Sequence, residues 1–269
     1  MRILLPPSQT KRDGGAEDSA LDLSALGFAR LTPLRRRMLA AVRSLCSNRA
    51  TAAAALRLSR TQYFEVERNR ALRRSPVLPA MDRYTGVLYD ALGAASLGAR
   101  ARDFARERVV IHSALFGLVR AADPIPAYRL SHDSRVPGHP LGSHWKSAIE
   151  RELVGLSGLV LDLRSEAYVD LGPAGPASQF LRVVTRDANG SHRALNHFNK
   201  KGKGEFLRAL LLAGIDHASV ESLLTWADGS GFRLERAGPG EIQLIVWAAS
   251  RMPSCSSSHS FVGTPRPPL

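Results

Sequence analysis

The chain has 269 residues, of which 44% are apolar, the composition of a folded globular protein rather than a fibrous or disordered one. Its two cysteines, Cys46 and Cys255, exclude a disulfide framework and a paired-cysteine metal site. No apolar run is long enough to cross a bilayer, and the N-terminal one is too short for a signal peptide, so we expect a cytoplasmic protein without membrane contact. The formal net charge of +13 makes a polyanion the first partner to consider.

The positive charge is concentrated in two segments. Residues 30–74 hold twelve arginines against two glutamates, and residues 196–208 hold three lysines and one arginine against one glutamate. The rest of the chain is close to neutral. An arginine excess also occurs in chains from G+C-rich genomes, so the placement of the charge says more about partners than its total does.

The N-terminal third is predicted to be a short strand followed by helices. Residues 2–5 form an apolar run that Pro6 and Pro7 end, because proline neither donates to a sheet ladder nor continues a helix there. A helix is predicted from Thr32 to residue 45, because a capping residue and a proline precede apolar residues at every third or fourth position. Helical patterning continues through residues 50–74 and, after prolines, to about residue 105.

The rest of the chain mixes strands and helices irregularly. We predict strands at residues 109–111, 159–163, 180–185, 194–198, 232–236 and 242–247, and helices at residues 145–156 and 204–212. Because regular strand–helix alternation is missing, we expect an α+β fold, with one mixed-sheet domain over residues 1–250 and a helical N-terminal third. Residues 251–269 are rich in serine and proline and are expected to form a disordered tail.

No nucleotide-binding or hydrolase fingerprint occurs, so the candidate site is sought among polar residues that follow strands. The loop after the first strand holds Ser8, Thr10 and Lys11. These side chains can hold a phosphate or carboxylate, and a desolvated Lys11 can act as a base or nucleophile. An ordinary solvated loop with capping hydroxyls is the alternative.

Two further loops carry polar residues in similar positions. Ser165, Glu166 and Tyr168 follow the strand at residues 159–163. Glu166 and Tyr168 can move protons to and from a ligand, although a serine there is also typical of a helix start. Arg129 follows a Pro-x-Pro turn, whose rigid backbone suits an arginine that binds an anion; a structural ion pair is the alternative.

The two basic segments are candidates for phosphate binding. Lys200, Lys201 and Lys203 alternate with glycines before the predicted helix at residues 204–212, so that cationic side chains and free backbone N–H groups can form a phosphate cradle. The arginine-rich helices offer Arg35, Arg36 and Arg43 for contact with a nucleic-acid backbone. A solvated helical face decorated with arginines is the alternative.

The histidines do not form a metal-binding motif. His132, Asp133, His139 and His144 lie in a loop-like segment and match no zinc spacing. We therefore expect no metal and no cofactor.

Five segments together match a known family in order and spacing. They are Leu4–Lys11, Arg83–Gly86, the pair Ser113–Arg120 and Asp123–Leu130, Leu161–Tyr168, and Asn199–Gly204. In these segments the chain resembles the YaaA family of bacterial proteins associated with peroxide stress. The first loop departs from the family pattern, because Lys11 follows Thr10 where the family has lysine before threonine.

The resemblance implies a single cytoplasmic α+β domain with a positively charged cleft and a helix-hairpin-helix-like element, for which residues 92–98 are the candidate. It also implies a protein that limits oxidative DNA damage and binds duplex DNA. Nucleic-acid binding is therefore our leading hypothesis for the function.

A second hypothesis comes from the polar loops. Backbone binding needs cations but no Glu–Tyr pair, so the same cleft is also predicted to serve a small-molecule enzyme acting on a nucleotide, nucleoside or related heterocycle. In that case Arg129 and Lys201 hold the anionic group, while Glu166 or Lys11 handles the proton or serves as nucleophile. Iron binding through histidines and carboxylates is a third hypothesis, and the sequence leaves the oligomeric state open.

Overall fold

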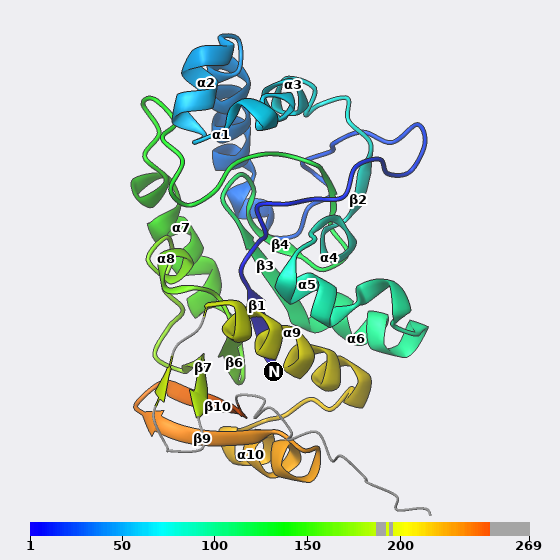
Figure 1. The fold of residues 1–269 in the computed structure, drawn as a ribbon, viewed down its shortest axis with the longest axis vertical. Coiled ribbons are helices and arrows are strands. Elements are labelled where there is room, and N and C mark those ends of the chain that lie inside the picture. Colours follow the sequence, from blue (N-terminus) through cyan, green and yellow to red (C-terminus); the bar gives the residue numbers. More distant parts are fainter. Residues whose placement is uncertain (187–191, 194–195, 248–269) are drawn as a thin grey trace, which may run out of the picture.

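The computed structural model describes residues 1–186, 192–193 and 196–247 (Figure 1). Strand β1 (Arg2–Leu5) opens the chain, and a mainly helical segment follows, as predicted. It contains the 3-10 turns η1 (Ala29–Leu31), η2 (Arg60–Gln62) and η3 (Ala94–Ser96), and the helices α1 (Thr32–Leu45), α2 (Arg49–Ala55), α3 (Phe64–Arg70), α4 (Ala80–Arg83), α5 (Val87–Leu92) and α6 (Ala99–Arg108).

The remaining elements alternate between strands and helices. The strands are β2 (Val77–Pro79), β3 (Val109–Ser113), β4 (Gly117–Arg120), β5 (Pro124–Pro126), β6 (Val160–Asp162), β7 (Ser178–Arg186), β8 (His192–Arg193), β9 (Arg233–Gly238) and β10 (Glu241–Trp247). The helices are α7 (Leu141–Val154), α8 (Glu166–Val169), α9 (Asn196–Ala213) and α10 (Val220–Gly229). The strand predicted at residues 194–198 is wrong, because residues 196–198 already belong to α9; residues 194–195 lie outside the described residues.

Eight strands form one sheet, seven of them in the order β4-β3-β1-β6-β7-β10-β9, with β8 paired to β7. Neighbours from β3 through β10 run parallel, whereas β4 and β9 are antiparallel to their partners. Strands β2 and β5 form a separate antiparallel pair. The mixed sheet is therefore confirmed, but its parallel centre makes the fold mixed α/β rather than α+β.

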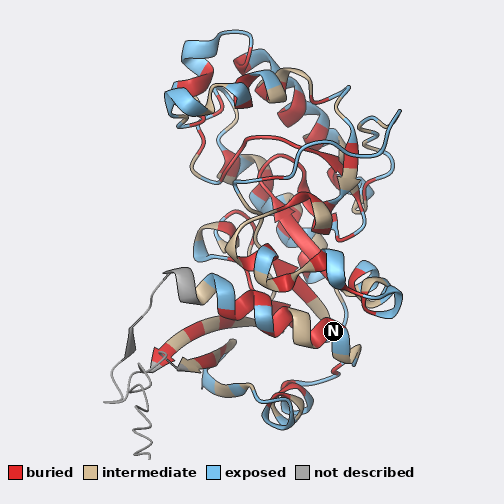
Figure 2. Cartoon of the chain, turned by 45° about the vertical axis from the view of Figure 1, so that its right-hand side comes forward, coloured by how far each residue is buried: buried red, intermediate tan, exposed pale blue. Residues whose placement is uncertain are grey.

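The hydrophobic core lies around the parallel strands and beneath the helices. Every residue of β3 is buried, and so are three of the four residues of β1. Figure 2 shows buried positions running along the central strands and the inward faces of the helices. Strands buried on both faces are typical of parallel sheets, because helices cover each side.

This topology places one edge of the sheet in a special position. Strand β1 has β3 on one side and β6 on the other. The strand order therefore changes direction at β1: the chain passes from β1 to β3 on one side and later returns to β6 on the other. The carboxyl ends of these three parallel strands lie at a common edge, and ligands of open parallel sheets bind where the strand order changes direction. Residues that follow β1, β3 and β6 are thus the first place to look for a site.

None of the helices in the described residues is long and apolar enough to span a bilayer. The expected tail at residues 251–269 lies outside the described residues, and the single-domain boundary at residue 250 stays a prediction.

Candidate functional site

The side chain of Lys11 lies buried beyond the carboxyl end of β1, with 8% of the residue exposed. Its Nζ donates hydrogen bonds to the backbone oxygens of Ser8, at 2.9 Å, and Gln9, at 3.3 Å. Lys11 also forms a β-bridge with Tyr84. The loop after Pro6-Pro7 therefore folds back over its own lysine and holds the amine inside the protein.

Two tyrosines form the walls around this amine. The Lys11 Nζ lies 4.0 Å from the centroid of the Tyr128 ring and 5.4 Å from that of Tyr84. The Tyr84 and Tyr128 hydroxyls are 2.8 Å apart, and the Tyr128 hydroxyl lies 2.7 Å from Oγ of Ser113, the last residue of β3. Burial raises the pKa of Tyr128 to about 12 and that of Tyr84 well above its usual value, so this chain of hydroxyls stays protonated.

Burial favours the neutral form of Lys11. Burial lowers the pKa of Lys11 to about 7, Glu65 opposes this change, and Arg129, Arg68 and Arg83 add to it. An ordinary lysine is almost wholly charged at neutral pH. A substantial fraction of Lys11 is therefore a free amine, the form that acts as a base or nucleophile.

Arg129 is fixed beside this cluster by its backbone. Its N–H donates to Asn69 Oδ1 at 2.9 Å, and its carbonyl accepts from Asn69 Nδ2 at 2.8 Å. The guanidinium donates from NH1 to Oε1 of Gln9 at 3.1 Å, while its buried Nε has no hydrogen-bond partner among the described residues. A buried arginine with an unused donor is equipped to bind an anion.

The rim of the site carries the predicted hydroxyls. Ser8 Oγ and Thr10 Oγ1 lie 3.2 Å apart, and Thr10 is exposed. Both face Gly86, where a Cβ atom would lie 3.1 Å and 3.2 Å from them and where φ is +97°. Only glycine adopts such a conformation without strain, so this close approach explains the glycine of the Tyr-Thr-Gly segment.

Tyr168 lies beside this cluster, but Glu166 does not join it. Tyr168 is buried, its ring lies edge-on to that of His132, and Tyr128 and Arg129 both influence its pKa, which burial raises well above the usual value. The Glu166 side chain is 72% exposed and pairs with Arg182 at 3.1 Å. The predicted Glu–Tyr pair is not formed, because residues two apart on a helical turn point in different directions.

The lysine-rich segment differs from the predicted cradle. Helix α9 begins at Asn196, so the backbone N–H groups of residues 200–204 already lie inside the helix rather than at its free end. Lys203 is buried and donates to the backbone oxygens of Leu163, at 3.1 Å, and Arg164, at 3.2 Å. Its predicted role as a phosphate contact is therefore wrong; Lys203 instead ties α9 to the loop after β6.

Three other predicted ligands lie at the surface. Lys200 and Lys201 are exposed on α9, and Lys201 pairs with Glu205 at 3.5 Å. Ser165 is the exposed residue before α8, and its side chain makes no capping hydrogen bond. None of the three contacts the Lys11 cluster through an interaction within the described part of the chain.

The predicted arginine contacts divide between core and surface. Arg35 is fully buried, and its guanidinium donates to the backbone oxygens of Gly27, Phe116 and Leu118 at 2.6 to 2.9 Å. Its assignment as a phosphate contact is wrong, because no phosphate can reach it. Arg36 and Arg43 are exposed on α1 and remain available.

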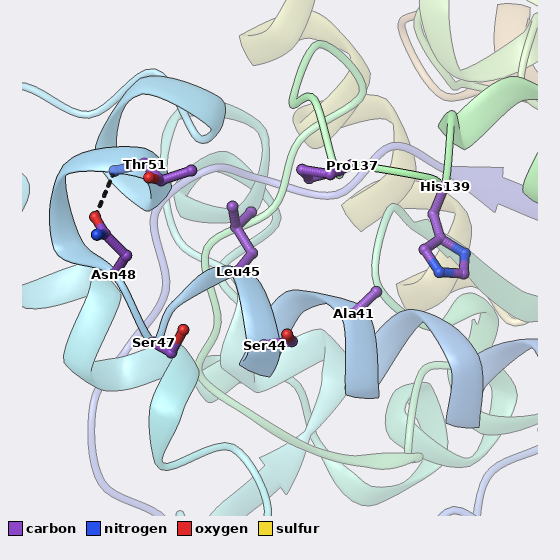
Figure 3. A pocket seen from close by; sticks show the side chains of 8 residues that line it. All are labelled: Ala41, Ser44, Leu45, Ser47, Asn48, Thr51, Pro137 and His139. Atoms are coloured by element: carbon purple, nitrogen blue, oxygen red, sulfur yellow. Dashed lines mark hydrogen bonds between the residues drawn. The ribbon is translucent and has the colours of Figure 1, made fainter.

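Two hollows occur near these elements. One of about 350 Å³ lies between the α1–α2 turn and the loop around Pro137 and His139 (Figure 3). Asn48, in the wall of this hollow, caps α2 by accepting a hydrogen bond from the N–H of Thr51. None of the predicted site residues lines the hollow. A second hollow, of about 200 Å³, adjoins the Lys11 cluster, because Tyr84 and Thr85 line it.

The four residues considered for metal binding do not converge on one site, although the ring centroids of His139 and His144 lie 5.7 Å apart. His132 packs against Tyr168, Asp133 pairs with Arg57 at 3.2 Å, and a ring nitrogen of His144 lies 3.1 Å from the backbone oxygen of Leu34. No group of three potential metal-ligating side chains converges anywhere in the part of the chain that the structure describes.

The site includes residues that the sequence prediction did not select. Tyr84 and Tyr128 stand in segments that carry the family resemblance, so that resemblance was a signal for them. Gln9 lies inside the predicted loop, between two chosen residues. Asn69 comes from α3 and has no sequence signal, because only the tertiary fold brings it to Arg129.

Comparison with known proteins places the chain in a family. The family model described as "Peroxide stress protein YaaA" matches residues 1–237. The chain belongs to the YaaA family. A UPF0246 protein of Corynebacterium glutamicum (strain R) is 40% identical over 240 residues, covering 87% of this chain and 95% of that protein. A UPF0246 protein of Streptomyces coelicolor is 35% identical over 246 residues, covering 90% and 94%. The YaaA match spans β1, the Lys11 loop and both basic segments, so the site described above lies within the shared region.

Proposed function

We propose that this YaaA family protein acts in peroxide stress by binding the backbone of duplex DNA through the arginines of α1–α3. One observation carries the proposal: seven exposed arginines on and beside these helices have no carboxylate partner among the described residues. They are Arg30, Arg36, Arg37, Arg43, Arg60, Arg73 and Arg74.

Free guanidinium groups are what a nucleic-acid backbone requires, because each can neutralise a phosphate and release a counterion. Other arginines in this region already have partners: Arg57 pairs with Asp133, and Arg68 and Arg70 pair with glutamates one helical turn away. Helices α1–α3 form one end of the molecule, whereas α9 with Lys200 and Lys201 lies nearer its other end (Figure 1). The helical end, rather than α9, is therefore the main proposed interface.

The segment at residues 92–98 is proposed as a second contact. Helices α5 and α6 flank it, and Gly93 ends α5 in the left-handed conformation with φ +59°. A short turn between two helices is the arrangement that a helix-hairpin-helix-like element requires, and this supports the resemblance.

The proposed interface is tested by two double variants of equal charge loss. Arg36→Ala/Arg43→Ala removes two free arginines from α1, and Lys146→Ala/Arg151→Ala removes two exposed cations from α7. Fluorescence anisotropy with a labelled duplex should show about tenfold weaker binding for the α1 variant, or roughly 0.7 kcal/mol per arginine, and little change for the α7 variant. Equal weakening by both variants would mean that only net charge matters and would contradict the assigned surface.

We also propose a second function, catalysis on a small anionic molecule at the Lys11 cluster. The specific observation is the buried, partly neutral amine of Lys11 beside a clamped arginine. In this proposal Arg129 holds the anionic group of a nucleotide-like compound, Lys11 acts as base or nucleophile, and the Tyr84–Tyr128–Ser113 hydroxyls transfer protons. Glu166 has no part in it, because its side chain is exposed and paired with Arg182.

Binding of adenosine monophosphate provides a test of this second function. Isothermal titration calorimetry should detect binding to the wild type and its loss in Arg129→Gln, while Lys201→Gln binds normally. Binding that survives Arg129→Gln, or that is absent from the wild type, would contradict the assignment of Arg129 as the anion ligand.

A further inference from the structure

We propose that Lys11 forms a Schiff base with an aldehyde or ketone that also carries a carboxylate or phosphate, and that Arg129 binds this anionic group. The inference rests on the second proposed function, namely that the Lys11 cluster is an active site, and it names the substrate class of that site. The juxtaposition that carries it is a buried amine, an arginine whose backbone is held by Asn69 and a chain of three hydroxyls at the carboxyl ends of β1 and β3.

The hydrogen bonds of Lys11 leave room for a lone pair when the amine is neutral. A neutral amine has two N–H groups and one lone pair, and the backbone oxygens of Ser8 and Gln9 accept two hydrogen bonds from Nζ. These acceptors leave the lone pair free to attack a carbonyl carbon. Burial, together with Arg129, Arg68 and Arg83 and against the effect of Glu65, lowers the pKa of Lys11 to about 7 and keeps this form populated.

The anion site is occupied by a replaceable side chain. Gln9 Oε1 accepts the hydrogen bond from Arg129 NH1, and Gln9 is exposed, so a carboxylate or phosphate oxygen can take its place without disturbing the core. The Arg129 Nε, which has no partner among the described residues, offers a second donor for a two-point contact. The surrounding arginines outnumber Glu65, which favours a negatively charged substrate over a neutral one.

The reaction needs no oxidant or reductant. The Nζ lone pair forms a bond to the carbonyl carbon while the carbon–oxygen π bond breaks, and a proton moves from nitrogen to that oxygen. The carbon–oxygen bond of the resulting carbinolamine then breaks as the carbon–nitrogen double bond forms, and the second proton of the nitrogen leaves with the hydroxyl group as water. One amine and one carbonyl compound thereby give one imine and one water. The Tyr84, Tyr128 and Ser113 hydroxyls form a chain along which the proton can move.

Lys203 provides an internal comparison. It is also buried, and burial lowers its pKa to about 8, but the backbone oxygens that it contacts belong to the loop after β6, and Asp162 favours its charged form. No described tyrosine hydroxyl or free arginine donor is found among its contacts. We therefore expect Lys203 to remain unmodified under conditions that modify Lys11.

The test traps the imine in the full-length protein at pH 7. Glyoxylate is added with sodium borohydride, and peptide mapping by mass spectrometry locates the reduced adduct. One adduct per chain, on Lys11, is expected, while Lys203 and the exposed Lys146 stay unmodified. Adducts spread over exposed lysines, with Lys11 untouched, would overturn the proposal. This mapping uses the wild type and does not depend on the folding of a variant.

The role of Arg129 is tested with two carbonyl compounds. Acetaldehyde carries no anion, so the ratio of glyoxylate capture to acetaldehyde capture on Lys11 should fall about tenfold in Arg129→Gln, a change of about 1.4 kcal/mol. An unchanged ratio would show that Arg129 does not bind the anion. Lys11→Arg should lose both adducts while keeping the wild-type circular dichroism spectrum, and an adduct that persists would overturn the assignment to Lys11.

A second arm distinguishes the source of the carbonyl group. An abasic deoxyribose in duplex DNA also presents an aldehyde next to phosphates, so the experiment is repeated with such a duplex. A borohydride cross-link through Lys11 points to damaged DNA, whereas capture of glyoxylate alone points to a free small molecule; capture of neither overturns the proposal. If adenosine monophosphate binds through Arg129 but no adduct forms, the Schiff base fails while the proposed function stands.

Discussion

Replacement of Arg35 by alanine should destabilise the fold strongly. The Arg35 guanidinium lies in the core and donates three hydrogen bonds to backbone oxygens. The acceptors are the carbonyl oxygens of Gly27, of Phe116, which directly precedes β4, and of Leu118 within β4. Burial lowers its pKa to about 10, so it is charged at neutral pH. Arg35→Ala takes the guanidinium donor from two buried backbone oxygens and one partly buried one, and it opens a cavity.

The size of the effect follows from these contacts. A hydrogen bond to a charged group contributes about 1.5–3 kcal/mol, and water that enters the vacated space restores part of the loss. We expect Arg35→Ala to lower the free energy of unfolding by about 4 kcal/mol, a large part of the roughly 5–15 kcal/mol of a typical domain. Arg36→Ala, one residue along on the exposed face, should change it by less than about 0.5 kcal/mol.

Urea denaturation followed by circular dichroism measures both variants under the same conditions. A loss for Arg35→Ala within about 1 kcal/mol of that for Arg36→Ala would refute the structural role of the buried guanidinium. The pair also separates folding from binding, because Arg36 is a proposed DNA contact and Arg35 is not.

Three further changes test the packing and the buried charges. Gly204→Ala should lower stability by about 2 kcal/mol or more, because the new Cβ would lie 2.3 Å from a backbone oxygen of α5, whereas Gly229→Ala meets open space and should be nearly neutral in thermal melts. The carboxylate of Asp162 lies 2.6 Å from the buried guanidinium of Arg164, so Asp162→Ala leaves that charge without its partner. The free energy of unfolding, measured with urea, should fall by about 3–5 kcal/mol, and a loss below about 1 kcal/mol would contradict the importance of the pair. The unfolded chain holds the Lys11 proton up to about pH 10.4, but the folded protein only to about 7, so wild-type stability should rise with pH between these values. Between pH 7 and 9.5 the free energy of unfolding of Lys11→Met should rise by about 3 kcal/mol less than that of the wild type. The same rise in both proteins would show that the amine is not buried.

The sequence predicted the elements better than their arrangement. Strand β1, helix α1 and the strands from β6 onwards follow from apolar runs and spacing, and nearly all of them occur in the structure. The parallel centre of the sheet could not be inferred, because a helical segment separates β1 from β3, while β4, β5 and α7 separate β3 from β6, and this hides the strand–helix alternation. Strand direction depends on these distant pairings rather than on local sequence.

The candidate site shows the same division. Lys11 and Arg129 were selected as candidates from their positions after a strand and after a rigid turn, and the structure places them in one cluster. Arg35 and Lys203 were misplaced, although a signal existed: Arg35 falls on the apolar face of α1 with Met38 and Val42, and Lys203 stands on the apolar face of α9 with Phe206 and Leu207. Positive residues on an apolar helical face indicate burial rather than solvent contact.

The salt dependence of DNA binding tests the central claim most directly. Affinity for a labelled duplex is measured over a series of salt concentrations, and the logarithm of the binding constant is plotted against the logarithm of salt concentration. The wild type should give a steep negative slope, and Arg36→Ala/Arg43→Ala should make it shallower by about 1.8, or roughly 0.9 for each lost phosphate contact. Lys146→Ala/Arg151→Ala should leave the slope unchanged. A wild-type affinity that does not fall with salt, or a slope that the α1 variant does not alter, would contradict backbone binding by these helices.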